Sequence, residues 1–110
     1  MNPVHVNLAA GRWKELSLVE QMANIGSEVE RCLNWRARGN ADLAERAFER
    51  SLELIDLTLD DPKNRHRSRE VARVREIWAG HGRGGELDTS SDESWRRYFL
   101  SYAVAARRNR

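Results

Sequence analysis

The sequence predicts an all-α protein: an up-down antiparallel four-helix bundle, in one domain that spans residues 1–110. The chain is rich in Ala, Leu, Glu and Arg and holds two prolines, a composition that favours helix over strand. Apolar residues recur at spacings of three and four, which is typical of amphipathic helices. Short connections between such segments indicate antiparallel neighbours. With 110 residues, 40% of them hydrophobic, the chain can form one core.

The first predicted helix covers about residues 17–38 and follows a segment, 1–16, that we expect to be irregular. Ser17 and Glu20 have the spacing of a capping box, in which each side chain accepts a hydrogen bond from the other residue's backbone N–H. Gly39 suits a left-handed helix stop, and the next residue is Asn, which suits the cap of a second helix. One face of this helix is apolar and carries Leu18, Met22, Ile25, Val29, Cys32 and Leu33.

The second predicted helix, about 41–60, is the most apolar and ends at the Asp60-Asp61-Pro62 break. One stripe consists of Ala44, Phe48, Leu52, Ile55 and Leu59, and an adjacent stripe consists of Leu43, Ala47, Leu54 and Leu57. An apolar arc this broad contacts either two neighbours inside the bundle or another subunit. We therefore expect the adjacent stripe to be an interface, for a homo-oligomer or for a larger protein partner.

The third predicted helix, about 63–79, begins with a basic run and buries a thinner stripe of Val71, Val74, Ile77 and Trp78. Four glycines among residues 80–85 disfavour helix, so a Gly-rich loop is expected over 80–90. Residues 90–93 have the composition of a helix cap. The last helix then carries Trp95, Phe99, Tyr102 and Ala106 on one face and ends in a basic tail.

Charge is distributed unevenly along the chain. Residues 1–62 hold 7 basic and 11 acidic side chains, whereas residues 63–110 hold 12 basic and 6 acidic ones. Clustered arginines suit phosphate recognition because the guanidinium group binds two oxygens at once. This pattern predicts a surface for RNA, DNA or an acidic partner, formed by Lys63, Arg65, Arg67, Arg69, Arg73, Arg107 and Arg108. The alternative is a solvated helix face, balanced by Glu70 and Glu76, in a chain whose arginine content reflects codon usage.

An enzymatic alternative rests on two residues. Arg75 and His81 have the R-x5-H spacing that resembles the ribonuclease motif of small helical HEPN toxins. That resemblance implies a dimeric bundle in which the histidine moves a proton and the arginine stabilises phosphorane charge during RNA cleavage. A chain with 17 arginines among its 19 basic residues generates this spacing easily by chance. We therefore expect a non-enzymatic binding or adaptor module, with a module that makes only protein–protein contacts as a further alternative.

Other classes of function lack a pattern in this sequence. The three histidines are scattered and the cysteine, Cys32, is single, so no metal site, disulfide or cofactor is expected. The glycines of 80–85 are not followed by the Lys-Ser/Thr of a phosphate-binding loop. No apolar run is long enough to span a membrane and no signal peptide is apparent, so we expect a cytoplasmic protein. No small-molecule substrate is indicated.

Several runs together resemble a recurring set of small, uncharacterised helical proteins of prokaryotes. They are Gly11-Arg12-Trp13-Lys14-Glu15-Leu16-Ser17-Leu18, residues 20–29 (EQMANIGSEV), Ala47-Phe48-Glu49-Arg50, residues 54–58 and Asp61-Pro62-Lys63-Asn64-Arg65. No activity is assigned to that set, so the resemblance implies no catalytic residue. Its hallmarks here are Asn24, Gly26, Ser27 and Asp56, which lie within otherwise apolar helices. Gly26 costs helix stability, about 1 kcal/mol relative to Ala, so close approach of another helix is its expected role.

Overall fold

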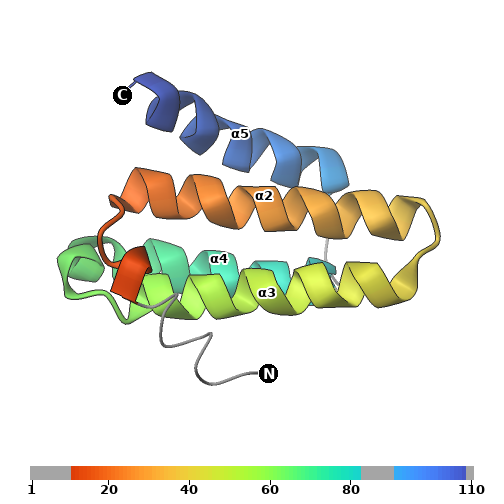
Figure 1. Cartoon of the computed structure of the whole chain (residues 1–110), viewed down its shortest axis with the longest axis horizontal. Helices are drawn as coiled ribbons and strands as arrows, with labels where there is room; N and C mark the ends of the chain where they lie inside the picture. The colour runs from red at the N-terminus through yellow and green to blue at the C-terminus, as the bar shows by residue number, and fades with distance from the viewer. Residues whose placement is uncertain (1–10, 83–90, 109–110) are drawn as a thin grey trace.

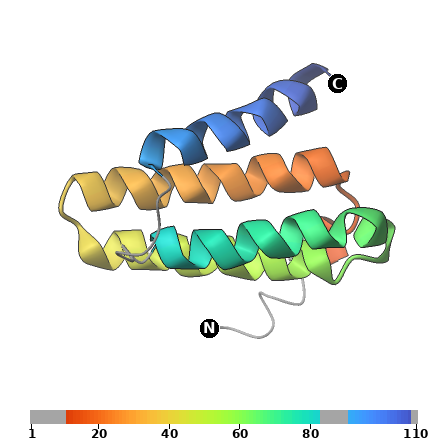
Figure 2. The same ribbon diagram turned by 180° about the vertical axis from the view of Figure 1, so that it is seen from behind.

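The computed structural model describes residues 11–82 and 91–108, and every regular element in these ranges is helical. The elements are α2 (Leu18–Ala37), α3 (Ala41–Leu59), the short 3-10 helix η1 (Pro62–Arg67), α4 (Ser68–Gly82) and α5 (Asp92–Arg108). Each long helix runs opposite to the one before it (Figures 1 and 2). The predicted all-α class is confirmed. Within the predicted irregular segment, residues 11–13 are helical, and residues 1–10 lie outside the described ranges.

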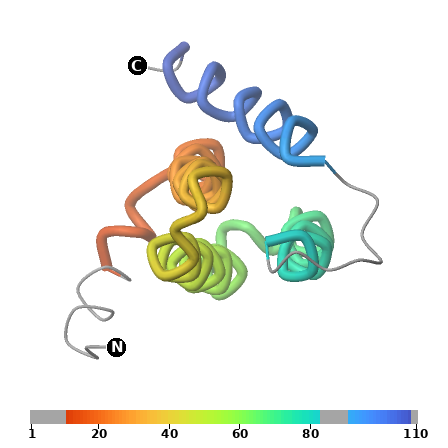
Figure 3. Tube along the Cα trace, turned by 90° about the vertical axis from the view of Figure 1, so that its right-hand side faces the viewer, coloured from red at the N-terminus to blue at the C-terminus, as the bar shows by residue number. Residues whose placement is uncertain are grey.

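Helix α2 is at the centre of the arrangement. It packs against α3 on one side and against α5 on the other, and α4 lies beside α3 (Figure 3). The axis of α5 is inclined to that of α2, so the two helices diverge along their length (Figure 1). Side chains make the main link between α5 and α4, including the contact between the rings of Trp95 and Trp78. The fourth helix is therefore held mainly by α2.

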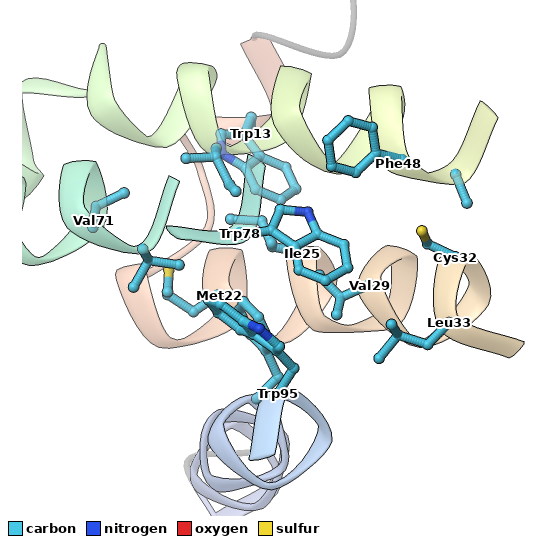
Figure 4. Packing of buried hydrophobic residues seen from close by; sticks show 14 residues of the cluster. Trp13, Met22, Ile25, Val29, Cys32, Leu33, Phe48, Val71, Trp78 and Trp95 are labelled. Carbon is cyan, nitrogen blue, oxygen red and sulfur yellow. The ribbon is translucent and has the colours of Figure 1, made fainter. Parts of the chain in front are cut away.

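The hydrophobic core is formed by the predicted apolar faces of the four long helices, which pack against one another (Figure 4). Trp78 is fully buried and packs against the rings of Phe48 and Trp95. The distance between ring centroids is 5.8 Å to Phe48 and 5.4 Å to Trp95. The Trp78 indole Nε1 donates to Ser51 Oγ at 2.8 Å, so its polar atom is satisfied inside the core. Trp13 is buried at the core edge, whereas Trp35 is half-buried and lies under the Arg38 guanidinium.

The helix ends near residues 17 and 39 follow the predicted capping chemistry. Ser17 Oγ accepts from the Glu20 N–H at 3.1 Å, and Glu20 Oε1 accepts from the Ser17 N–H at 3.0 Å. Gly39 has a φ of 79°, a conformation that glycine adopts without strain, and Asn40 Oδ1 accepts from the Leu43 N–H. These local signals produce the tight, antiparallel α2–α3 hairpin.

A network of buried polar side chains joins the start of α2 to the turn after α3. Gln21 Nε2 donates to the Trp13 carbonyl at 2.9 Å and to Asp61 Oδ2 at 3.0 Å. Asn64 Nδ2 donates to Gln21 Oε1 at 2.7 Å and to the Thr58 carbonyl at 3.0 Å. Burial of Asp61 opposes ionisation, but hydrogen bonds from Lys63 and Gln21 outweigh it and lower the pKa of Asp61. The network satisfies polar atoms from three chain segments at once.

The predicted helix over 63–79 is wrong at its start, because residues 62–67 form η1 and the α-helix begins at Ser68. Asp61 is the N-cap of η1, with Oδ1 accepting from the Lys63 N–H, and Pro62 follows at the first helical position. Asn64 is buried and turned into the polar network. These bonds tighten the first turn, so Lys63, Arg65 and Arg67 lie on η1 and not on α4.

The predicted loop over 80–90 is wrong for residues 80–82, which belong to α4. Arg36 Nη1 donates to the carbonyls of His81 and Gly82, at 2.9 and 3.1 Å, and so satisfies oxygens that a helix end leaves free. Gly82 is buried, and a Cβ at this position would overlap the Phe48 ring. Long-range contacts therefore extend the helix despite its glycines, and the rest of the predicted loop, 83–90, lies outside the described residues.

Gly26 allows the close approach of α5, as predicted. A Cβ there would lie 2.7 Å from Phe99 Cβ, whereas a Cβ at the helical Gly80 would meet nothing within 4 Å. We expect Gly26→Ala to lower the free energy of unfolding by about 1–3 kcal/mol, because α5 must shift outward. Gly80→Ala is the matched control and should raise stability by up to about 1 kcal/mol. Thermal unfolding followed by circular dichroism measures both, and a stabilised Gly26→Ala protein would contradict this packing.

Candidate nucleic-acid interface

The predicted basic residues occupy three elements: Lys63, Arg65 and Arg67 lie on η1, Arg69 and Arg73 on α4, and Arg107 and Arg108 at the end of α5. The end of α5 and η1 lie at the same end of the molecule (Figures 1 and 2). Seen along the helices, the last turns of α5 lean away from α4 (Figure 3). The structure therefore brings the five residues of η1 and α4 together on consecutive elements and leaves the α5 pair apart from them.

Two of these basic side chains are engaged within the fold. The Lys63 ammonium donates to the Asp61 carboxylate and to the Lys14 carbonyl, so it belongs to the buried polar network. Arg67 Nε donates to Glu70 Oε2 at 2.7 Å, one turn along the chain. Both contacts hold η1 in place, and they reduce the availability of these cations for a ligand.

Arg65, Arg69 and Arg73 differ from those two. All three are exposed, and no carboxylate among the described residues pairs with any of them. They are four residues apart, which corresponds to a rise of about 6 Å per step in an α-helix and somewhat more through the 3-10 turn. We call these three residues the arginine ladder. Their guanidinium groups retain full capacity to bind phosphate oxygens.

An acidic side chain lies beside the ladder. Glu70 Oε1 accepts from the Tyr102 hydroxyl at 3.1 Å and from the Tyr98 hydroxyl at 3.5 Å, which links α4 to α5. Partial burial opposes ionisation, but the hydrogen bonds from Arg67 and Tyr102 outweigh it and lower the pKa of Glu70. Burial raises the pKa of Tyr98, so the phenol stays protonated and donates. Glu70 is thus a charged carboxylate with three donors around it.

A groove between α4 and α5 was missed by the sequence reasoning. It has a volume of about 360 Å³, and its wall consists of Glu70, Arg73, Val74, Ile77, Ser94, Trp95 and Tyr98. Ile77 is 38% exposed there, although its spacing predicts a core position. The groove exists because α5 packs on α2 and meets α4 through long side chains. Helical periodicity places Ile77 on the apolar face but carries no information about the spacing of the two helices.

The Arg75 and His81 pair is not brought together. Arg75 points to α3, where its Nε donates to Asp56 Oδ1 at 2.6 Å. His81 is on α4 and not in a loop, which corrects its predicted place, and six residues on an α-helix correspond to a rotation of about 120° between the two side chains. The geometry of the described residues gives the ribonuclease interpretation no support.

His81 instead joins three helix ends. Its Nε2 lies 2.7 Å from Asp92 Oδ1 at the start of α5, and Arg36 Nη2 of α2 donates to the same oxygen at 2.9 Å. Burial of Asp92 opposes ionisation, but the contacts with His81 and Arg36 outweigh it and lower the pKa of Asp92. Acting with the Arg36 bonds to the end of α4, this junction fixes where α5 begins.

The predicted interface stripe on α3 is largely covered within the chain. Ala47 belongs to the core, Leu54 and Leu57 pack against it, and Leu43 is half-buried. The large apolar side chains exposed among the described residues are Ile77 on α4 and Leu100 and Val104 on α5. Self-association through the α3 stripe stays a prediction.

Among residues 11–82 and 91–108, no cluster of three or more His, Cys, Asp or Glu side chains has a geometry that could hold a metal ion. In the same ranges, no helix has the length and apolar character needed to cross a bilayer. Burial raises the pKa of the Cys32 thiol, which is an unreactive core group. Comparisons with protein-family models, curated proteins and solved structures gave no match.

Proposed function

We propose that this chain is a non-enzymatic binding module, built as an up-down antiparallel four-helix bundle, whose η1–α4 surface contacts the phosphate backbone of a nucleic acid. The observation that carries the proposal is the arginine ladder, because Arg65, Arg69 and Arg73 are exposed and have no acidic partner among the described residues. Glu70, the acidic side chain beside the ladder, pairs with Arg67 and accepts from two tyrosine hydroxyls, and it leaves these three arginines unpaired.

The charge of the neighbouring elements supports the same assignment. Residues 62–82 hold six basic and two acidic side chains, whereas α3 holds two basic and five acidic ones. An anion therefore encounters attraction on the η1–α4 side and repulsion on the α3 side, which orients the approach of a polyanion. Contacts of this kind position a backbone and carry no sequence information, so we expect affinity without strong sequence preference.

The test is the salt dependence of binding. Three phosphate contacts on a single strand give a slope of about −2 for log K against log salt, or about a 20-fold loss between ~50 and ~200 mM salt. We expect Arg65→Glu/Arg69→Glu to weaken binding by about tenfold or more and to flatten this slope. Fluorescence anisotropy with labelled RNA and DNA oligonucleotides of about 12 nucleotides measures both quantities.

The matched control is Arg12→Glu/Arg46→Glu, which changes net charge equally at exposed positions outside η1 and α4. This control should retain most of the affinity. Equal losses in the two variants would indicate a net-charge effect and contradict a localised site. Unchanged affinity for RNA and DNA in Arg65→Glu/Arg69→Glu would overturn the proposal.

The homo-oligomer expected from the sequence is part of this proposal, since a two-fold assembly would double the number of ladders that meet one polyanion. Light scattering of the purified chain, with the 260/280 nm absorbance ratio recorded before nuclease treatment, tests assembly and bound nucleic acid together. A monomer free of nucleic acid would remove the oligomer from the proposal.

A further inference from the structure

We propose that the ligand is single-stranded nucleic acid, and that the groove between α4 and α5 receives one unpaired base while the arginine ladder binds the adjoining phosphates. The proposal rests on the proposed function and specifies its ligand. Two observations on different elements carry it: an apolar groove with aromatic side chains in its wall, and a row of unpaired cations that begins at that groove.

The groove has the composition that a base requires. Val74 and Ile77 of α4 form one wall, and Trp95 and Tyr98 of α5 form the other. Its volume of about 360 Å³ exceeds that of one heteroaromatic ring system, and Ile77 already exposes 38% of its surface to solvent. Every base has apolar faces, so apolar and aromatic contacts of this kind hold bases without regard to sequence.

Arg73 connects the groove to the ladder. It belongs to the groove wall, and its side chain is exposed and has no acidic partner among the described residues. Arg69 precedes it by about one helical turn on α4, and Arg65 lies further along, on η1. When a base of the strand enters the groove, the phosphates that follow it therefore lie beside the arginine ladder.

Glu70 selects which part of the strand enters. Its carboxylate is on the groove rim, one turn before Val74. A negative charge at this position repels a phosphate but is compatible with a neutral base. The carboxylate can also accept hydrogen bonds from the amino group of a base. The groove thus takes the base and leaves the backbone outside, on the arginines.

The dimensions disfavour other macromolecules. The apolar wall on α4 extends from Val74 to Ile77, which is about 4.5 Å along the helix axis. An amphipathic peptide helix with anchors at i, i+4 and i+7 needs about 10 Å of apolar wall. A duplex keeps its bases stacked inside and cannot present one to a groove without unpairing. A base in an unpaired strand fits the length of the apolar wall and is compatible with the Glu70 carboxylate beside it.

The experiment compares three ligands of about 12 nucleotides on the full chain: a single strand, the same backbone with abasic residues, and a duplex. We expect the single strand to bind about tenfold more tightly than the abasic strand, which has the same phosphates. Ile77→Gln should bring that ratio close to one and preserve affinity for the abasic strand, because the ladder is intact. Leu100→Gln makes the same change on α5 outside this groove and should leave the ratio unchanged.

The outcomes separate the two proposals. Equal affinity for all three ligands, with the salt dependence given above, overturns base insertion and leaves phosphate binding standing. If Ile77→Gln leaves the ratio of single-strand to abasic-strand affinity unchanged, the base does not bind in this groove and the assignment is overturned. Binding of an acidic amphipathic peptide, but of none of the nucleic acids, overturns both proposals. Circular dichroism of each variant confirms that the helices are retained.

Discussion

Replacement of Trp78 with alanine is expected to lower the free energy of unfolding by about 3–5 kcal/mol. Trp78 is fully buried and packs between the rings of Phe48 and Trp95, so its removal leaves a cavity bordered by three helices. The Ser51 hydroxyl also loses the indole donor that it accepts from at 2.8 Å. A loss of this size is a large part of the total stability of a small domain, about 5–15 kcal/mol. Urea unfolding followed by circular dichroism measures it.

Trp35→Ala is the control for that substitution. Trp35 is half-buried at the end of α2, and its contact with the Arg38 guanidinium, 5.5 Å from the ring centroid, is on the surface. We expect a loss of about 1 kcal/mol or less from this variant. Similar losses from Trp78→Ala and Trp35→Ala would show that the central aromatic cluster does not have the dominant role that its burial indicates.

Asp61→Asn is expected to lower stability at neutral pH by about 1–3 kcal/mol, because the charge-assisted bonds to Lys63 and Gln21 are weakened inside the network. The folded state holds the pKa of Asp61 below its ordinary value of 3.8. The carboxylate therefore stabilises the fold at pH values above 3.8, and this contribution is lost as the pH falls through the folded-state pKa. Unfolding free energies measured from pH 7 down to about pH 2 should fall less steeply in Asp61→Asn than in the parent protein.

Asp60→Asn provides the comparison, since Asp60 is the exposed neighbour and lies at the end of α3. Its pH profile should follow that of the parent protein. The remaining acid sensitivity in Asp61→Asn is assigned to Glu70 and Asp92, whose pKa values are also lowered in the fold. Parallel profiles for Asp61→Asn and the parent would contradict the role given to the Asp61 carboxylate.

The features that sequence reasoning predicted correctly depend on neighbours close in the chain. The Ser17–Glu20 capping box and the turn at Gly39 involve residues three or four positions apart. The core face of α2 follows from helical periodicity. The close approach at Gly26 follows from the low helix propensity of glycine, which needs a packing reason inside a helix. Local chemistry and period together were enough to assign α2 and α3, but they placed both ends of α4 wrongly.

The features that were missed depend on partners far along the chain. The helical state of Gly82 needs the Arg36 guanidinium, 46 residues away, and the tight turn of η1 needs Asn64 to meet Gln21, 43 residues away. The candidate groove requires the spacing between α4 and α5, which no repeat in either helix encodes. The division of the basic residues into paired and unpaired members is a local exception: Lys63 and Arg67 pair with the near neighbours Asp61 and Glu70, but sequence spacing alone does not show which cations these carboxylates contact.

The one-sided attachment of α5 has a consequence for how the molecule comes apart. Two residues of α5, Trp95 and Phe99, are fully in the core, whereas α2 contributes seven buried residues. Release of α5 would break its packing on α2 and its side-chain contacts with α4, and would leave α2, α3 and α4 as a unit that is contiguous in sequence. Such partial opening requires less free energy than global unfolding; it would expose Trp95 and remove the groove, because α5 forms one of its walls. We therefore expect α5 to open at a lower free energy than the α2–α3 hairpin, and the groove to exist only while α5 is docked.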